Sequence, residues 1–283
     1  MSRAVNDHSV APLPRAGKGW RPIVRSLTLL VGLSLSSTMV LAYADLLPQA
    51  ADRGAQDAAL PPSGRLPHVT QQLARGTTLR IVAFGSSSTE GVGASSPGAA
   101  YPAQLEIALK RALPRRANPL TVLNRGIGGE HVDDMLKRID RDVLAAEPDL
   151  VIWQTGSNDP LRGIALDHFR EATVAGVRRM QARGIDVVLM EPQWCPKLDA
   201  TPGADRFRDA VREIGQELGI PVIRRSDLMR RWIAEAQLTR AELFAADGLH
   251  MADRGYELLG QAVADDLLRG TRSGTAALAL VEQ

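Results

Sequence analysis

The chain reads LRIVAFGSSSTEG over residues 79–91. The apolar first half is typical of a buried strand, and the strand gives way at Gly85 to three consecutive serines. Glycine tolerates a sharp turn and the close approach of a ligand, so a hydroxyl nucleophile could be exposed here. By itself, a Ser/Gly cluster after a strand is more typical of an ordinary loop. The rest of the chain decides between these two interpretations.

Short apolar runs of strand type recur along the chain and alternate with stretches of helical periodicity. The predicted strands are 79–84, 121–124, 149–154, 186–191 and 221–224. The predicted helices are 101–113, 131–146, 169–182, 207–218 and 256–268. This alternation predicts an α/β fold, a parallel sheet with helices on both faces. Side chains that follow different strands then meet at one rim, outside the carboxyl ends of the strands.

Three polar segments follow later in the chain, two of them directly after predicted strands. They are 124–129 (NRGIGG), 155–159 (TGSND) and 247–250 (DGLH). Together with residues 85–89 (GSSST), they resemble the four blocks of the SGNH (GDSL-type) hydrolase family, and the resemblance covers residues 79–268. It implies a flavodoxin-like three-layer α/β/α sandwich whose five-stranded parallel sheet has the order 2-1-3-4-5.

The resemblance identifies Ser87 as the nucleophile, because Ser87 aligns with the serine of Gly-Asp-Ser-x-Thr in the family's first block. By chemistry alone, Ser88 or Thr89 could attack a substrate equally well. Ser86 stands where the family usually has aspartate. The residue that supports the nucleophile turn therefore differs from the family's, whereas the nucleophile itself is present.

A serine hydroxyl is a weak nucleophile at neutral pH and needs a base within hydrogen-bond reach. His250 suits that role because an unperturbed imidazole titrates near pH 6.5. Asp247, just upstream, could hold the ring in the required orientation, which is the logic of a Ser-His-Asp triad. The residues alone leave other possibilities: a loop histidine without a role, a metal site of Asp247, His250 and Asp253, or His131 as the base. His131 is more simply the start of a helix beside the second block.

Acyl transfer also needs hydrogen-bond donors for the oxyanion that develops on the substrate. Gly129 could offer its backbone N–H and Asn158 its side-chain amide. The N–H of Ser87 would be a third donor if a helix begins there. Seen alone, residues 128–129 would be a plain turn and residues 157–160 a helix-entry loop.

Residues 1–44 have an excess of positive charge. They hold five Lys and Arg residues against one Asp, whereas the whole chain has a net charge of +2, so the remainder is slightly acidic. This balance does not favour a nucleic-acid partner. Arg21 and Arg25 precede an apolar run over 27–41 that ends in a small-x-small motif at 42–44, the pattern of a secretory signal peptide. An uncleaved signal anchor is the alternative. Either form predicts a periplasmic or secreted domain whose membrane contact runs through this segment.

The remaining sequence sets the expected domain boundaries. Residues 45–78 have the composition of a linker, with one short helix near 71–74, and residues 271–283 that of a loose tail. The hydrolase domain would therefore span 79–270. Cys195 is the single cysteine, so no intramolecular disulfide supports the fold, and a small buried residue is its expected role.

Two other groups of residues have an expected location in the fold. Residues 191–194 follow the fourth predicted strand and could line a pocket, although Trp194 could equally pack in the core. A basic run is expected to form a solvated helix face rather than an anion site. That run consists of Arg224, Arg225, Arg230 and Arg231.

Taken together, the motifs predict an exported serine esterase that hydrolyses carboxylic esters through an acyl-enzyme, without a cofactor or metal. The expected substrate is a small-molecule or polysaccharide ester, such as an O-acetyl or short acyl ester. The first alternative is a cell-envelope O-acyltransferase that uses the same triad. The second is a non-catalytic envelope module with a decayed site, which only Ser86 supports.

Overall fold

The computed structural model of the protein describes residues 66–113 and 119–281, with side chains up to residue 271. By its internal contacts the chain divides into two units, 1–50 and 51–283, and every described residue belongs to the second. The predicted signal segment lies outside the described residues. Among those described, no helix has both the length and the apolar character that a membrane span requires.

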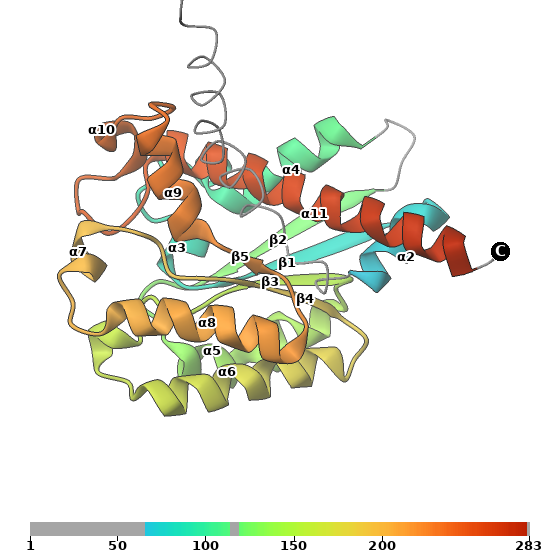
Figure 1. Ribbon diagram of the computed structural model, residues 1–283, viewed down its shortest axis with the longest axis horizontal. Coiled ribbons are helices and arrows are strands. Elements are labelled where there is room, and N and C mark those ends of the chain that lie inside the picture. Colours follow the sequence, from blue (N-terminus) through green and yellow to red (C-terminus); the bar gives the residue numbers. More distant parts are fainter. Residues whose placement is uncertain (1–65, 114–118, 282–283) are drawn as a thin grey trace, which may run out of the picture. The chain divides into compact units, whose positions relative to one another are not determined.

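Five parallel strands form a sheet in the order β2-β1-β3-β4-β5 (Figure 1). They are β1 (Leu79–Gly85), β2 (Leu120–Gly126), β3 (Leu150–Gln154), β4 (Asp186–Met190) and β5 (Val222–Ile223). Every residue of β3 is buried, which explains why its sequence is apolar without alternation. The predicted flavodoxin-like strand order is confirmed.

Helices cover both faces of the sheet and complete the three layers (Figure 1). One face carries α2 (Pro67–Arg75), α4 (Tyr101–Ala112), α9 (Arg225–Ala234) and α11 (Asp253–Val281). The opposite face carries α5 (Val132–Asp142), α6 (Leu166–Gln181) and α8 (Ala204–Leu218). The two layers therefore enclose two separate apolar cores with the sheet between them.

The side chains of β1 divide between these two cores. Ile81 and Ala83 pack in the core under α4 and α11, whereas Val82 and Phe84 pack in the core under α5 and α6. Successive side chains of a strand point to opposite faces of the sheet, so a strand covered on both faces needs apolar residues throughout. This requirement accounts for the continuous apolar run that precedes Gly85.

Short helices lie in the loops that join these elements. Those that follow strands at their carboxyl ends are α3 (Ser87–Glu90), η3 (Pro160–Arg162) and α7 (Pro196–Asp199). The others are η1 (Pro97–Ala99), η2 (Leu144–Ala146) and α10 (Arg240–Leu243). The carboxyl rim of the sheet is thus built from short structured segments.

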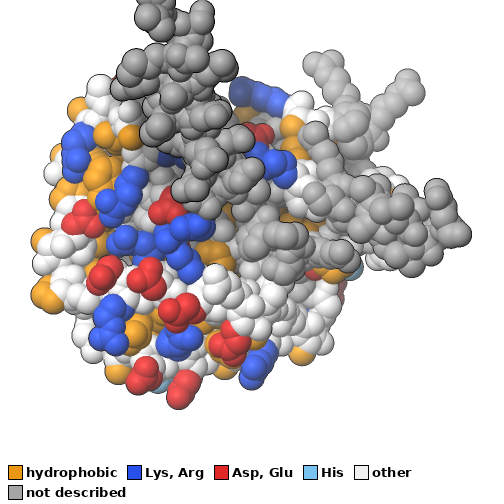
Figure 2. All heavy atoms as spheres, in the orientation of Figure 1, with side chains coloured by type: hydrophobic (Ala, Val, Ile, Leu, Met, Phe, Trp, Pro, Cys, Tyr) orange, Lys and Arg blue, Asp and Glu red, His pale blue; other side chains and the backbone are white. Residues whose placement is uncertain are grey.

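The charged surface that bears α8 is mixed in sign. Figure 2 shows Lys and Arg side chains interspersed with Asp and Glu over the described part of this face. Arg170 of α6 and Glu213 of α8 form an ion pair at 2.5 Å. The described part of this face therefore carries charges of both signs.

Both predicted domain boundaries need correction. Helix α2 lies inside the predicted linker, and its residues Leu66 and Val69 are buried in the same core as Leu79. The packed domain therefore begins by Leu66. At the other end, residues 271–281 continue helix α11 and are not the loose tail that was predicted. A buried stripe that includes Leu267 anchors this helix, and the alanine-rich sequence beyond it favours continuation.

Candidate active site

Three side chains from two distant segments form a chain of contacts at the carboxyl rim of the sheet. His250 Nε2 is 2.7 Å from Ser87 Oγ, and His250 Nδ1 is 2.5 Å from Asp247 Oδ2. Ser87 and His250 are 9% and 8% exposed, so the central contact is shielded from bulk water. The three residues that the sequence analysis singled out as nucleophile, base and orienting acid are therefore brought together.

The nucleophile turn forms where β1 ends. Helix α3 begins at Ser87, with Ser86 at its N-cap and the Ser86 carbonyl accepting from the N–H groups of Thr89 and Glu90 at 3.0 and 2.9 Å. The first N–H groups of a helix have no acceptor inside it, so the N–H of Ser87 is available beside its own hydroxyl. Gly85 leaves room for Thr89 at the end of β1, because a Cβ on residue 85 would overlap Thr89 Oγ1.

The histidine loop is organised by Asp247. One carboxylate oxygen, Oδ1, accepts from the N–H groups of Leu249 and His250, both at 2.9 Å, while the other contacts the His250 ring. Partial burial raises the pKa of Asp247, but hydrogen bonds from the His250 ring and from these two backbone groups outweigh it and hold that pKa at about 2. The carboxylate is therefore ionised at neutral pH and can only accept. It places the proton of the neutral imidazole on Nδ1 and leaves Nε2 to accept from Ser87.

Gly129 and Asn158 reach the same region through their neighbours. A Cβ at Gly128 would lie 3.8 Å from Ser87 Cβ, so the loop after β2 passes beside the nucleophile. The Asn158 amide donates to the carbonyl of Glu130 at 2.8 Å, which ties the loop after β3 to the loop after β2. The second N–H of that amide remains for a ligand. Gly129 itself has φ of +77°, a backbone conformation that favours glycine.

His131 occupies the position expected of a helix-start residue. It is the N-cap of α5, and its Nδ1 accepts from the N–H of Asp133 at 3.3 Å. Its Nε2 lies 3.2 Å from Asp134. Both ring nitrogens are thus engaged at the start of α5. As for metals, the described residues contain no cluster of His, Cys, Asp and Glu placed to hold an ion.

Sequence reasoning missed a set of buried polar side chains behind the triad. Gln154 at the end of β3, Ser157, Gln193 and Arg225 are all at most 4% exposed and are joined by hydrogen bonds. The prediction that Arg225 belongs to a solvated face is wrong, because it is fully buried while its neighbour Arg224 is 44% exposed. A glutamine that ends an otherwise apolar strand was the available signal.

The residues after β4 pack rather than line an open pocket. Trp194 is 9% exposed, donates to Asp199 at 2.7 Å, and lies under the guanidinium groups of Arg230 and Arg240. Cys195 is a free, buried cysteine, and burial raises the pKa of its thiol. Both residues therefore have structural roles in this part of the fold.

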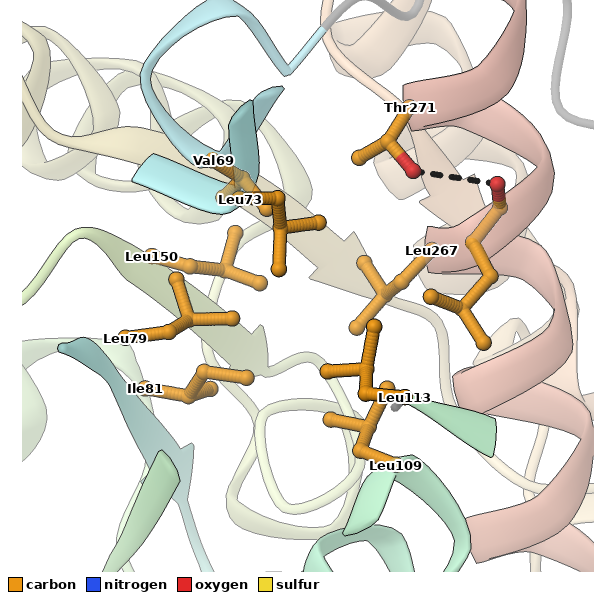
Figure 3. A pocket seen from close by; sticks show the side chains of 10 residues that line it. Val69, Leu73, Leu79, Ile81, Leu109, Leu113, Leu150, Leu267 and Thr271 are labelled. Atoms are coloured by element: carbon orange, nitrogen blue, oxygen red, sulfur yellow. Dashed lines mark hydrogen bonds between the residues drawn. The ribbon is translucent and has the colours of Figure 1, made fainter. Parts of the chain in front are cut away.

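A small apolar cavity lies at the far end of the sheet from the triad. Figure 3 shows side chains of α2, β1, β3, α4 and α11 converging on it, with Val69 and Leu73 facing Leu267. The cavity measures about 10 Å³, and Leu79 and Leu150 place it at the amino ends of β1 and β3. It is separate from the candidate active site.

Residues 54–273 match the Non-GDSL lipase-like family. Two curated proteins are similar over most of their length. An uncharacterized lipoprotein, YqeF, of Bacillus subtilis (strain 168) is 24% identical over 219 residues, covering 65% of this chain and 88% of that protein. An arylesterase of Vibrio mimicus is 24% identical over 161 residues, covering 57% of this chain and 76% of that protein.

Solved structures share the fold. A lipase/acylhydrolase from Enterococcus faecalis superposes with a TM-score of 0.56 at 27% identity, covering 67% of this chain and 95% of that one. A two-domain esterase active on acetylated mannans superposes with a TM-score of 0.62 at 22% identity, covering 76% of this chain. The present chain spans 56% of the length of that esterase.

The family, the motifs and the fold agree with one another. The family description also fits Ser86, which interrupts the Gly-Asp-Ser motif. The chain belongs to the Non-GDSL lipase-like family and is an SGNH-type hydrolase.

Proposed function

We propose that the protein is a serine esterase that hydrolyses carboxylic esters through an acyl-enzyme, with Ser87 as nucleophile, His250 as base and Asp247 as orienting acid. The observation that carries this proposal is the His250 ring, which contacts Ser87 Oγ on one side and the Asp247 carboxylate on the other. Geometry of this kind defines a catalytic triad regardless of the fold that presents it.

In the first half of the reaction, Ser87 Oγ attacks the ester carbonyl carbon and its proton passes to His250 Nε2. The tetrahedral intermediate collapses, the bond to the alcohol breaks, and His250 returns the proton to the departing oxygen. In the second half, water loses a proton to His250 and attacks the acyl carbon. The acid product leaves and Ser87 regains its proton. Asp247 stays ionised throughout and stabilises the imidazolium that forms twice.

The oxyanion of each intermediate would be held by the N–H groups of Ser87 and Gly129 and by the Asn158 amide. Each such donor typically contributes about 2.7–4 kcal/mol to the stabilisation of the transition state. The position of Gly128 beside Ser87 and the link from Asn158 to Glu130 support this assignment, because they connect the loops that carry Gly129 and Asn158 to the segment of the nucleophile. The mechanism requires no cofactor or metal.

We propose acetyl or other short acyl esters of small molecules or polysaccharides as the substrate class. The esterase on acetylated mannans and an acetyl xylan esterase of the same fold support this choice. The pattern of Arg21, Arg25 and the following apolar run supports an exported protein, as does the lipoprotein relative. N-terminal sequencing of the protein recovered from the periplasm or membrane would distinguish a cleaved signal peptide from an anchor.

The decisive experiment compares the wild type with Ser87→Ala and, as a matched control, Ser88→Ala. Ser88 is the adjacent buried serine and the alternative nucleophile by chemistry alone. Each protein is incubated with a fluorophosphonate probe and with p-nitrophenyl acetate. Labelling and turnover should vanish with Ser87→Ala and persist with Ser88→Ala. If labelling and turnover vanish only with Ser88→Ala, Ser88 and not Ser87 is the nucleophile.

Two other outcomes have defined meanings. Labelling of Ser87 without turnover of p-nitrophenyl acetate would favour acyl transfer, tested by adding a sugar acceptor and measuring the acylated product. Absence of any labelling in the wild type would contradict the esterase proposal and favour the non-catalytic module.

A further inference from the structure

Behind the triad, a chain of hydrogen bonds crosses the buried rim from the nucleophile turn to the histidine loop. Gln154 Oε1 accepts from Ser86 N at 3.0 Å and Ser86 Oγ at 3.1 Å, and Gln154 Nε2 donates to Ser157 Oγ at 3.2 Å. Ser157 Oγ donates to Gln193 Oε1 at 2.9 Å, and Gln193 Nε2 donates to the Leu249 carbonyl at 3.2 Å. We call these five residues the buried relay.

The direction of every bond in the buried relay is determined by its ends. The backbone N–H of Ser86 can only donate, so the atom of Gln154 that faces it must be the oxygen. The guanidinium of Arg225 can only donate, so the atom of Gln193 it contacts at 2.7 Å must also be the oxygen. Ser157 then accepts from one glutamine and donates to the other. All the bonds are therefore compatible at once.

The members of the buried relay stand next to the residues that perform the chemistry. Ser86 precedes Ser87, Ser157 precedes Asn158, and Leu249 precedes His250. The relay therefore connects the segments that present the nucleophile, the amide donor and the base.

From this arrangement we propose that the buried relay is a positioning device that sets the distance between Ser87 and His250, with Ser157 and Gln193 as its central positioning residues. The catalytic part of this statement rests on the proposed esterase function. The geometric part does not, since it concerns the distance between two side chains in the folded protein.

Burial makes the relay stiff. Its four side-chain members, Ser86, Gln154, Ser157 and Gln193, are at most 4% exposed, so water is not a ready substitute for a lost partner. A buried polar group left without a partner costs about 1–3 kcal/mol, and linked hydrogen bonds reinforce one another in a low dielectric. Small displacements of one loop relative to another are therefore resisted.

Arg225 anchors the relay to the sheet. It is fully buried, and besides Gln193 it donates through Nε to the carbonyl of Glu191 at 3.2 Å. The Glu191 carboxylate in turn pairs with Arg212 at 2.5 Å and accepts from Ser226 Oγ at 2.5 Å. Burial lowers the pKa of Arg225 to about 10, which still leaves it charged at neutral pH.

The buried relay also gives a role to the serine at the position where the SGNH motif usually has aspartate. A carboxylate on residue 86 would face Gln154 Oε1, which already accepts from Ser86 N and from Thr89 Oγ1. A hydroxyl donates to that oxygen instead, so Ser86 and Gln154 form a matched pair. The departure at Ser86 is thus compensated by the end of β3 and is no sign of a decayed site.

The test uses the full chain with Gln193→Glu, Ser157→Ala and Thr155→Val. Glutamate at position 193 keeps the contacts with Arg225 and Ser157 but turns a second oxygen towards the Leu249 carbonyl. Ser157→Ala cuts the relay in the middle. Thr155→Val is the matched control, because its hydroxyl is buried two residues from Ser157 and has no hydrogen-bond partner among the described residues.

Crystal structures of the three variants measure the distance from Ser87 Oγ to His250 Nε2 directly. We expect it to exceed hydrogen-bond reach, about 3.5 Å, in Gln193→Glu and Ser157→Ala and to stay at 2.7 Å in Thr155→Val. Retention of the contact in both relay variants would overturn the proposal, whether or not the protein is an esterase. A variant that does not crystallise is assessed from the ¹⁵N resonance of His250 Nε2, the nitrogen that accepts from Ser87 Oγ.

Kinetics then separate positioning from a general loss of stability. A displacement of about 1 Å can lower turnover by about 10²-fold, so kcat for p-nitrophenyl acetate should fall by that order in both relay variants while KM changes little. Their melting temperatures should stay above the assay temperature. A fall in kcat that only follows the folded fraction would contradict the positioning role. If Ser87→Ala retains wild-type turnover, the esterase proposal fails. The distance from Ser87 Oγ to His250 Nε2 in the relay variants still tests whether the buried relay positions these two side chains.

Discussion

His250 Nε2 lies 2.7 Å from Ser87 Oγ although 163 residues separate them in the chain. Contacts between the two segments hold this pairing in place. The hydroxyl of Tyr256, early in α11, donates to the Val92 carbonyl just after α3 at 2.7 Å. The N–H of Ser95 donates to Asp253, the first residue of α11, at 2.7 Å. The start of α11 is therefore fastened to the loop after the nucleophile, and the histidine loop precedes it directly.

Replacement of Asp247 by Asn should lower kcat by about 10⁴-fold. The amide would donate to His250 Nδ1, so the ring proton would move to Nε2 and the nitrogen that faces Ser87 could no longer accept. Turnover of p-nitrophenyl acetate by Asp247→Asn measures this effect. Asp167→Asn, at an exposed acid in the first turn of α6, is the control and should retain wild-type kcat. Equal activity of the two variants would show that Asp247 does not set the tautomer.

Replacement of Asn158 by Ala should lower kcat by about 10²–10³-fold, because it removes one of the proposed oxyanion donors. Asn158→Asp keeps the shape of the side chain but offers only acceptors, so a carboxylate would face the developing oxyanion. It should therefore be at least as damaging. Measurement of kcat and KM for both variants checks this ordering. If Asn158→Asp retained more activity than Asn158→Ala, a hydrogen-bond donor at position 158 would not be needed, and the proposed oxyanion role of Asn158 would be wrong.

Asp186 should make the protein less stable as the pH rises from acid to neutral. Burial raises the pKa of Asp186 to about 6, despite a hydrogen bond from Val69 N and the nearby His68; the Asp149 charge adds to the increase. The unfolded pKa is near 3.9, so the native state binds this proton more tightly. The stabilisation is complete below about pH 4 and is lost as the pH rises through about 6.

Asp186→Asn tests this prediction, because its side-chain oxygen can still accept from Val69 while the titration is removed. The free energy of unfolding, measured in urea at pH 4.5 and pH 7, should fall less between these two values in the variant than in the wild type. Identical slopes would mean that Asp186 titrates at its ordinary pKa in the folded protein.

Val69→Ile should stabilise the protein slightly without changing its activity. The added methylene would enter the apolar cavity of about 10 Å³ between α2, α4 and α11 (Figure 3). Burial of one methylene contributes at most about 0.8 kcal/mol. Urea unfolding measures the gain, and kcat should match the wild type because the cavity lies at the other end of the sheet. A loss of stability would show that the site is too tight for the larger side chain.

Much of this architecture is predictable from the sequence, because it depends on local patterns. Apolar runs that alternate with helical periodicity determined the parallel sheet, and the carboxyl ends of parallel strands must meet at one rim. Residues that follow β1, β2 and β3 were therefore expected there, and contacts of Ser87, Gly128 and Asn158 link all three segments. The choice of Ser87 over Ser88 came from the family resemblance, since both carry the same hydroxyl.

The tertiary structure alone decided the contacts between residues that are distant in sequence. The burial of Arg225, the packing of α2 against β1 and the bonds of Gln154 and Gln193 have no local pattern. An arginine in a basic run looks like a surface residue, and a glutamine that ends an apolar strand signals burial without identifying its partners. Only the fold supplies partners, such as Ser86 at 68 residues from Gln154, that make their burial favourable. The sequence by itself thus determined which residues reach the rim, and the packed structure decided which of them hold the others in place.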